Sequence, residues 1–231
     1  MKYLGHIIGS GKHRPDPQRL QAVEGMKPPS TKKQLQSVLG LFNYYRDYVP
    51  NFAAIAKPLT DLTAQRKPKL LIWGESEQRA YELLKDKICH SPVLAVPQPG
   101  KPFLWYTDAS EIAVGCQLAQ YDDEGNEHPV AYASSKLNAT QRNWAVIERE
   151  AYAVVWALGH YRNMIFGAPL AVYCDHNPLK YLTQSAPKSA KLTRWSLALQ
   201  EYDLTNKYVK GKANLVAVSY THLTLPTKRI V

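Results

Sequence analysis

The first part of the chain combines short β-rich segments with a run of helical periodicity. KYLGHIIGSG consists of strand-forming residues closed by glycines, and it begins so close to Met1 that we expect an upstream partner strand to be missing. Asp16 stands before Pro17, the arrangement of an N-cap followed by proline at the first helical position. These positions predict a short helix from Pro17 to about Gly25.

Two longer helices are predicted further along this first part. Residues 31–34 have the form of a capping box, and apolar side chains then recur at helical spacing up to a stop near Pro50. These apolar positions are Leu35, Val38, Leu39, Phe42 and Tyr45. A third helix is expected after Trp73, capped near Glu75 or Ser76. Its inner face is predicted to carry Ala80, Leu83, Leu84 and Ile88.

From Pro102 onward the pattern changes to period two or to continuous β-formers. KPFLWYTDAS, AVGCQLAQY and HPVAYASSKL predict three antiparallel strands, with DDEGNE as the turn between the second and the third. A long helical run from about Thr140 to Met164 follows, and then the strand LAVYCD. A helix around residues 191–201 and a last strand, LTNKYV, complete a mixed α/β pattern.

The composition is that of a globular chain with a basic balance. With 231 residues, of which 45% are apolar, the chain can bury the core of one large domain or two modest ones. The net charge of +10 points to a polyanionic partner, and nucleic acid is the leading candidate. Up to Lys101 there are 16 basic and 8 acidic residues, so most of the excess charge lies in the first part. The alternative is a basic but merely soluble surface.

Cysteine usage and apolar runs predict an intracellular protein. Cys89, Cys116 and Cys174 are odd in number and form no C-x-x-C pair, so neither a disulfide framework nor a zinc site is predicted. The apolar stretch from Tyr3 to Ile8 is far shorter than a signal-peptide core. We therefore expect no membrane association and no secretion, and an intracellular location in the cytoplasm or the nucleus.

Three acidic residues occupy unusual positions for the elements predicted around them. Asp108 lies near the end of an apolar strand, Glu150 inside a helix, and Asp175 directly after another apolar strand. A carboxylate beside buried residues loses hydration, and a cation, a hydrogen-bond network or a metal ion compensates for this. Three oxygen ligands without histidine or cysteine favour Mg²⁺ or Mn²⁺. Taken singly, the two aspartates could instead form turns or caps, and Glu150 a solvated helix charge.

The residues around these acids, and the order of the predicted elements, resemble a known family. YTDAS surrounds Asp108, EREAYAVVWAL surrounds Glu150, and YCDHNPLKYL surrounds Asp175. With LGHII, PDPQRLQAV and QSVLGLFNYYRDYVPNFAAIAKPLTDL, they resemble the Gypsy-type (Ty3-like) LTR retrotransposon Pol polyprotein from Tyr3 to Ala217. The resemblance implies an α/β, RNase H-like domain with a mixed five-stranded sheet and flanking helices. A mainly helical reverse-transcriptase thumb and connector would precede it.

The same resemblance divides the chain into three segments. Residues 1–72 correspond to the end of the reverse-transcriptase palm and to thumb-like helices, and residues 73–217 to a connector helix and the RNase H-like domain. Residues 218–231 no longer resemble the family, and we expect them to come from a read-through or an assembly junction. An extra strand is the alternative for this threonine-rich tail.

The resemblance implies metal-dependent endonucleolytic hydrolysis of RNA in RNA–DNA hybrids. Asp108, Glu150 and Asp175 match three of the family's four catalytic, metal-binding acids, whereas Val218 stands where the family has the fourth. Two Mg²⁺ (or Mn²⁺) ions held close together need enough negative charge to offset their repulsion. We therefore expect this chain to bind one ion adequately and to cleave poorly or not at all.

The polymerase activity of the family is not expected in this chain, because its catalytic aspartate pair would lie in a palm segment before Met1. The Tyr-Asp-Asp sequence at residues 121–123 is predicted to be a hairpin turn, since Glu-Gly-Asn follows it. The expected partners are an RNA–DNA hybrid or another nucleic acid, and the rest of the Pol polyprotein, its palm and fingers. The resemblance also implies a virus-like particle as the cytoplasmic location. Two alternatives stay open: a non-catalytic nucleic-acid-binding remnant of a reverse transcriptase, and a domesticated interaction module.

Two groups of basic residues are candidates for contacts with phosphates. The nucleic-acid-binding residues expected are Lys32, Lys33 and Arg46 in the thumb-like helices, and Lys188, Lys191 and Arg194 in the second domain. Tyr44 and Tyr48 accompany the first group, and Trp195 the second. The alternative is a solvated basic face with the tyrosines packed into the core. An A-form-like duplex is recognised by its shape, so little sequence preference and a steep salt dependence are expected.

Three further tryptophans and one histidine have simple interpretations. Trp105, Trp144 and Trp156 lie in apolar patterns and are predicted to be core residues. His176 follows Asp175 and suggests a general base, but two-metal hydrolysis needs no protein base. We therefore expect His176 to be a local hydrogen-bonding residue.

Overall fold

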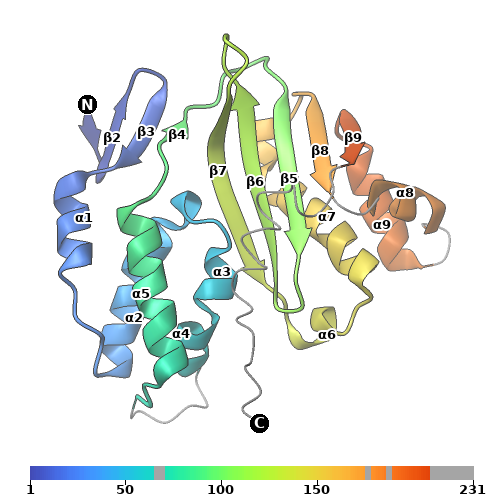
Figure 1. Cartoon of the computed structure of the whole chain (residues 1–231). Coiled ribbons are helices and arrows are strands. Elements are labelled where there is room, and N and C mark those ends of the chain that lie inside the picture. The colour runs from blue at the N-terminus through green and yellow to red at the C-terminus, as the bar shows by residue number, and fades with distance from the viewer. Residues whose placement is uncertain (65–70, 175–177, 186–188, 209–231) are drawn as a thin grey trace, which may run out of the picture. The chain divides into compact units, whose positions relative to one another are not determined.

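A computed structural model of the chain describes residues 1–64, 71–174, 178–185 and 189–208 (Figure 1). The chain divides into two compact units. The first contains Met1–Gln98 and Ala119–Lys136, and the second contains Pro99–Leu118 and the described residues from Leu137 onward. The helix after Trp73 lies in the first unit, and the functional division at residues 72 and 73 stays a prediction. No helix among the described residues is both long and apolar enough to span a bilayer.

The first unit combines a small sheet with a group of helices. Its strands pair in the order β1-β2-β3-β4, with antiparallel neighbours: β1 (Lys2–Tyr3), β2 (His6–Gly9), β3 (Lys12–Pro15) and β4 (Leu94–Ala95). Its helices are α1 (Pro17–Glu24), α2 (Lys32–Tyr44), the 3-10 turn η1 (Arg46–Tyr48), α3 (Phe52–Ile55), α4 (Lys57–Leu62) and α5 (Glu75–Cys89). The predicted β-rich start and mainly helical continuation are confirmed.

Local capping explains where the first helices begin. The Asp16 carboxylate accepts a hydrogen bond from the Gln18 backbone N–H at 3.1 Å, and Pro17 opens α1, as predicted. The capping box of α2 is also confirmed, because Thr31 Oγ1 accepts from the Gln34 N–H while Gln34 Oε1 accepts from the Thr31 N–H. These bonds satisfy backbone donors that have no partner within the helix.

The predicted start of α5 was one or two residues too late. Its N-cap is Gly74, not Glu75 or Ser76. The physical reason is that the Glu77 side chain reaches back and accepts from the Gly74 N–H at 3.0 Å, so the cap needs no side chain of its own. Trp73 supports this start, since its Nε1–H donates to Gln78 Oε1 at 2.7 Å.

The apolar faces of α2 and α5 form one core in the first unit. The buried members from the predicted faces are Leu35, Val38, Phe42, Tyr45, Ala80, Leu84 and Ile88. Leu39 and Leu83 pack at its margin. Tyr81 completes this core at 0% exposure, and its hydroxyl donates to the carbonyls of Met26 and Lys27. α2 ends at Tyr44, well before the predicted stop at Pro50, because η1 turns the chain at Arg46.

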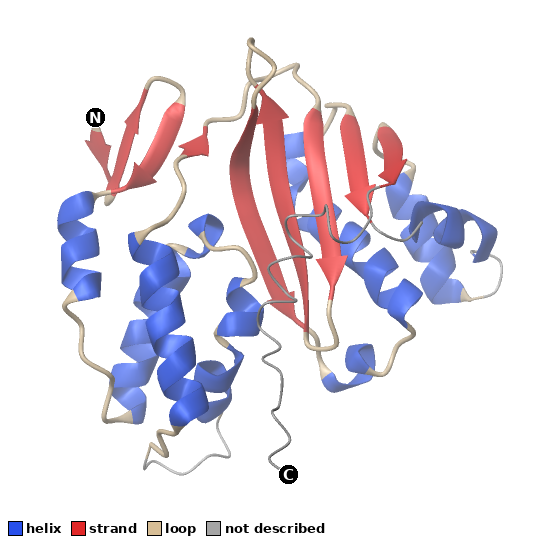
Figure 2. Ribbon diagram, viewed as in Figure 1, coloured by secondary structure: helices blue, strands red, loops and turns tan. Residues whose placement is uncertain are grey.

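A five-stranded mixed sheet supplies the frame of the second part of the chain. The strands are β5 (Phe103–Ala109), β6 (Ala113–Tyr121), β7 (Glu127–Lys136), β8 (Leu170–Cys174) and β9 (Leu204–Tyr208), in the order β7-β6-β5-β8-β9. β8 runs parallel to β5 and to β9. The short connections from β5 to β6 and from β6 to β7 make those neighbours antiparallel. The predicted strands and the mixed α/β class are confirmed (Figure 2).

The helices of the second unit depart from prediction at two places. They are α6 (Ala139–Arg142), α7 (Val146–Ile165), α8 (Pro178–Ser185) and α9 (Ala190–Leu199). The predicted continuous helix from Thr140 to Met164 is broken, because Ala145 adopts an extended conformation with ψ 152°. α8 was not predicted, although Pro178 at its first position is a favourable helix start. α9 ends at Leu199 rather than Glu201.

Candidate functional site

Strand β5 and helix α7 run in opposite directions against each other. The Trp105 ring meets the Tyr161 ring edge-on with 6.2 Å between centroids, while Ala109 packs in one apolar cluster with Ala153. From Trp105 to Ala109 the strand advances by ~13 Å. From Tyr161 back to Ala153 the helix covers ~12 Å. The end of β5 and the beginning of α7 therefore lie at the same end of the second unit (Figure 1).

Asp108 lies at this end of the unit. It is the penultimate residue of β5 and is 8% exposed. The parallel strand β8 lies beside it, with Tyr106 in register with Tyr173 and the two rings stacked at 4.8 Å. β8 ends at the buried Cys174. Asp175, the third predicted acid, follows Cys174 and lies outside the described residues.

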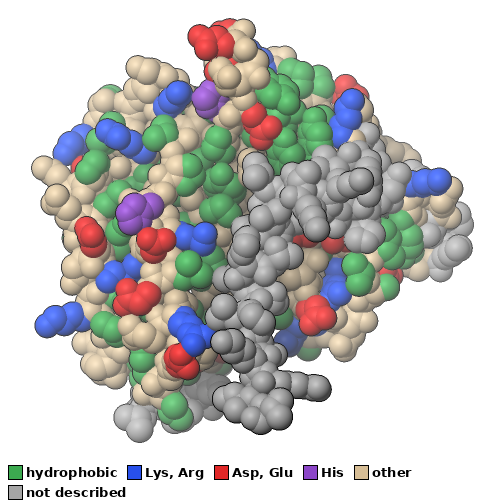
Figure 3. Space-filling view, in the orientation of Figure 1, with side chains coloured by type: hydrophobic (Ala, Val, Ile, Leu, Met, Phe, Trp, Pro, Cys, Tyr) green, Lys and Arg blue, Asp and Glu red, His purple; other side chains and the backbone are tan. Residues whose placement is uncertain are grey.

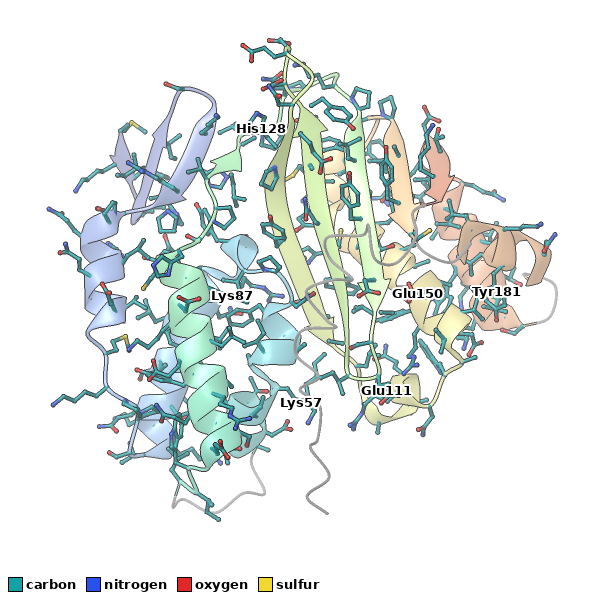
Figure 4. The ribbon with its side chains drawn as sticks, viewed as in Figure 1. Lys57, Lys87, Glu111, His128, Glu150 and Tyr181 are labelled. Carbon is teal, nitrogen blue, oxygen red and sulfur yellow. The ribbon has the colours of Figure 1, made fainter. Side chains whose placement is uncertain are left out.

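Glu150 lies near the beginning of α7 and is 2% exposed (Figure 4). α7 packs on β5, and Ala109 and Ala153 belong to one apolar cluster, so the structure brings two of the three predicted acids to one end of the unit. Neither acid is a solvated surface charge, because each is more than nine-tenths buried. The alternative interpretation of Glu150, as a solvated charge on the helix surface, is therefore wrong.

The donor chemistry of this end of the unit fits a divalent cation. Two buried carboxylates lose hydration and repel each other, and a bound cation offsets both the lost hydration and the repulsion. Carboxylate oxygens without histidine or thiolate suit Mg²⁺ or Mn²⁺ rather than Zn²⁺. The described residues, which do not include Asp175, contain no group of three or more His, Cys, Asp or Glu side chains placed to hold a metal ion.

The Tyr-Asp-Asp sequence forms a hairpin turn, as predicted. Asp122 Oδ1 accepts from the backbone N–H groups of Glu124 and Asn126, and Gly125 adopts a positive φ of 84°. Two hydrogen bonds hold the pKa of the Asp122 carboxyl well below its usual range. The larger effect comes from the Asn126 backbone N–H, and the second from the His128 side chain at 2.8 Å. This aspartate is thus occupied in closing the turn between β6 and β7.

The basic residues predicted in the thumb-like helices differ in their engagement. Lys33 is exposed, and the Lys32 ammonium donates to the Ala64 carbonyl at 2.7 Å. Arg46 is half-buried, and one terminal N–H donates to the Ser134 carbonyl at 2.6 Å. Tyr48 is 2% exposed and belongs to the core. On the face drawn in Figure 3, Lys and Arg side chains are scattered among acidic and polar ones.

The second basic group is only partly available for an external ligand. Lys191 Nζ lies 3.1 Å from Glu148 Oε1 and 4.1 Å from the centroid of the Trp144 ring. Arg194 is exposed, with its Nε–H donating to the Ala190 carbonyl at 3.3 Å. Lys188 and His176 lie outside the described residues.

No pattern near Lys191 in the sequence indicated its partners, because Glu148 lies 43 positions away along the chain. Trp105 is fully buried as predicted, whereas Trp144 and Trp156 are only half-buried. Trp144 is not simply a core residue, since its rings contact Trp195 and Tyr152 at 5.4 and 5.5 Å. Spatial proximity, rather than any local pattern, reveals this cluster.

Known structures share this architecture. The chain is 25% identical to the foamy viral protease-reverse transcriptase solved with dsDNA, with a TM-score of 0.78, covering 91% of this chain and 44% of that one. The same viral protein solved with an RNA/DNA hybrid gives a TM-score of 0.76 at 25% identity, covering 100% and 30% respectively. The family described as "RNase H-like domain found in reverse transcriptase" matches residues 98–202. The second part of the chain is therefore an RNase H-like domain of the reverse-transcriptase class.

Curated relatives place this domain in a wider family. The chain is 37% identical over 227 residues to the retrovirus-related Pol polyprotein from transposon opus of Drosophila melanogaster, covering 94% of this chain and 22% of the relative. It is 32% identical over 228 residues to the Pol polyprotein from transposon gypsy of the same species, with coverages of 94% and 22%. The chain belongs to the Gypsy-type (Ty3-like) retrotransposon Pol family, and it spans about a fifth of the length of these relatives.

Proposed function

We propose that the RNase H-like domain hydrolyses the RNA strand of RNA–DNA hybrids with Mg²⁺ or Mn²⁺. The observation that carries this proposal is the burial of Asp108 and Glu150 at one end of the second unit. Asp108, Glu150 and Asp175 would hold the metal. The bound ions would activate water and stabilise the leaving oxygen of the phosphodiester.

The protein's own residues supply rigid placement for this chemistry. Asp108 is held in a strand bonded to neighbours on both sides, and Glu150 lies in a 20-residue helix packed on that strand. Elements of this kind fix side chains more closely than loops do. Their low exposure also excludes bulk water from the carboxylates, which strengthens their attraction for a cation.

The residue at position 218 bears on how well the site would work. Val218 lies outside the described residues and brings no charge where the family resemblance implies a fourth acid. A missing ligand weakens the binding of a second ion most, because the repulsion between two divalent ions is then less well offset. We propose that this chain binds one ion and cleaves hybrids slowly or not at all.

A cleavage assay on an RNA–DNA hybrid tests this function. The chain, Val218→Asp and Val218→Asp with Asp108→Asn are compared with and without Mg²⁺. Val218→Asp is expected to cleave at least tenfold faster than the chain, since a second metal ion is then held. The double variant is expected to be inactive, as the metal-dependent mechanism requires. Cleavage by the chain at the full rate of Val218→Asp would contradict the proposed impairment, and activity of the double variant would contradict the site.

The partners that we propose are a hybrid duplex and the remainder of the Pol polyprotein. The net charge of +10 supports a polyanionic ligand, and a structural neighbour was solved with an RNA/DNA hybrid. Lys33 and Arg194 are exposed, and their positions favour phosphate contacts. Lys32 is less available, because its ammonium donates to the Ala64 carbonyl. Arg46, bound to Ser134, is a weaker candidate.

A non-catalytic nucleic-acid-binding remnant is the second candidate function. Val218, in place of an acid, is the observation that favours it. The two functions separate in a single comparison of magnesium-dependent product formation with salt-sensitive binding of the same hybrid. Binding without any product, even for Val218→Asp, would favour the remnant.

A further inference from the structure

Two helix N-termini of the second unit meet through an ion pair. Glu148 lies in the first turn of α7, and Lys191 is the second residue of α9. Lys191 Nζ lies 3.1 Å from Glu148 Oε1, and the two side chains are 30% and 22% exposed. The pair therefore joins segments that are 43 residues apart in the chain.

Aromatic rings surround the ammonium group of this pair. Lys191 Nζ lies 4.1 Å from the centroid of Trp144 and 5.2 Å from that of Trp195. The two indoles contact each other at 5.4 Å, and Tyr152 packs against both, at 5.5 and 5.8 Å. A cation over indole faces is attracted by their electron density, and partial removal from water strengthens its attraction to Glu148. This pair is thus held more firmly than an exposed surface pair.

The ion pair fixes the part of α7 that carries Glu150. Residues two positions apart on a helix point about 200° apart around its axis. Glu148 contacts α9, so Glu150 points to the opposite side of α7. The N-cap of α7, Ala145, makes no side-chain cap hydrogen bond, so no capping side chain anchors this first turn. Holding Glu148 therefore sets the rotation of the turn from which Glu150 projects.

We propose that Lys191 is a positioning residue, which acts through Glu148 to hold Glu150 in the orientation that binds a divalent cation. This role rests on the proposed function of the site. It also assigns Lys191 an internal partner in place of a phosphate group of a nucleic acid. The test must therefore separate metal affinity from nucleic-acid binding.

Three variants of the full chain probe this role. Lys191→Met keeps the length of the side chain and removes its charge, and Glu148→Gln keeps the shape of its partner. Lys191→Arg keeps a positive charge at this position, on a side chain that can stack on indoles. Arg142→Met is the matched control, because it removes an exposed charge from helix α6 of the same unit at a residue with no assigned binding role.

Calorimetry with Mg²⁺ gives the first readout. Lys191→Met and Glu148→Gln are expected to weaken Mg²⁺ binding on the order of tenfold, as the loss of outer-sphere orientation does in other metal sites. Lys191→Arg is expected to keep most of the affinity, and Arg142→Met to leave it unchanged. If Lys191→Met fails to fold, Glu148→Gln provides the same measurement with a nearly isosteric side chain.

The salt dependence of hybrid binding gives the second readout. A lysine that contacts a phosphate lowers the salt slope by about one when it is removed. Lys191→Met is expected to keep the slope of the unaltered chain. A slope lowered by one, or Mg²⁺ affinity equal to that of the unaltered chain, would overturn the positioning role. If the unaltered chain gives no heat with Mg²⁺, the proposed function itself fails, and this role fails with it.

Discussion

At the scale of single residues, one tyrosine of the first unit joins two histidines. Tyr48 Oη lies 3.0 Å from His6 Nδ1 and 2.6 Å from His13 Nδ1. The single hydroxyl proton serves only one of these nitrogens, so one imidazole accepts from Tyr48 and the other donates to it. His6 also stacks on the Tyr44 and Tyr48 rings at 5.2 and 5.7 Å. These contacts connect β2 and β3 to η1.

This arrangement makes the folded state sensitive to acid. Burial lowers the pKa of both imidazoles, and Arg19 lowers the pKa of His6 further while His6 lowers that of His13. Asp47 acts in the opposite direction on both. Since the folded pKa values lie below the unfolded value of 6.5, the unfolded state binds more protons as the pH falls below 6.5. The stabilisation is complete above this pH and is lost as the pH falls towards the folded pKa values.

The free energy of unfolding is therefore expected to fall between pH 7.5 and pH 5, measured by urea denaturation. His13→Gln should show a shallower decline over this range, because one of the two depressed groups is gone. His90→Gln is the control, since it removes an exposed imidazole at the end of α5, where the ring faces Asp86 rather than Tyr48. Equal slopes for His13→Gln and the unaltered chain would contradict this origin of the acid sensitivity.

At the scale of elements, local hydrogen bonds that can be predicted from the sequence stabilise the beginnings of helices. The Gln34 amide oxygen accepts from the backbone N–H groups of Ser30 and Thr31, at 2.9 and 3.2 Å. Thr31 Oγ1 in turn accepts from the Gln34 backbone N–H at 3.2 Å. α2 has no acidic residue in its first turn, so this box is the main compensation for its free backbone donors.

Thr31→Ala is expected to lower the free energy of unfolding by about 1 kcal/mol, because it removes the side chain that caps α2. Gln36→Ala, on the exposed side of the same helix, should change it by less than about 0.5 kcal/mol. Chemical denaturation of the two variants checks the difference. Equal stabilities would mean that packing alone determines where α2 begins.

The element scale also shows where sequence patterns fail. The run from Thr140 to Met164 shows helical periodicity, yet the chain breaks at Ala145. The half-buried Trp144 stands immediately before the break and packs on Trp195 and Tyr152. Helical propensity is a weak local preference, and burying a large ring against distant residues outweighs it.

At the scale of the whole molecule, charge governs the expected binding of nucleic acid. Hybrid affinity should fall steeply between 50 and 200 mM salt, because neutralised phosphates release counterions. Lys33→Gln is expected to lower the salt slope by about one. Lys85→Gln is the matched control, since its ammonium already donates to the Met26 carbonyl and is 15% exposed. Filter binding or anisotropy over a salt series measures both slopes, and equal slopes would remove Lys33 from the interface.

The sequence by itself determined the elements and the acids of this protein. The period-two strands, the caps at Asp16 and Thr31 and the turn after Tyr121 are local features, and each was found as predicted. The helical patterns placed α1, α2, α5, α7 and α9, but not all of their ends. Asp108 and Glu150 were recognisable because a carboxylate within an apolar segment conflicts with its surroundings.

Only the tertiary structure decided which distant side chains meet. Lys191 with Glu148, and Arg46 with Ser134, are separated by 43 and 88 positions. Lys191 and Arg46 had both been predicted to contact phosphates, and their internal partners change that expectation. The physical reason is that periodicity depends on near neighbours in the chain, whereas such pairs depend on how strands align and helices pack.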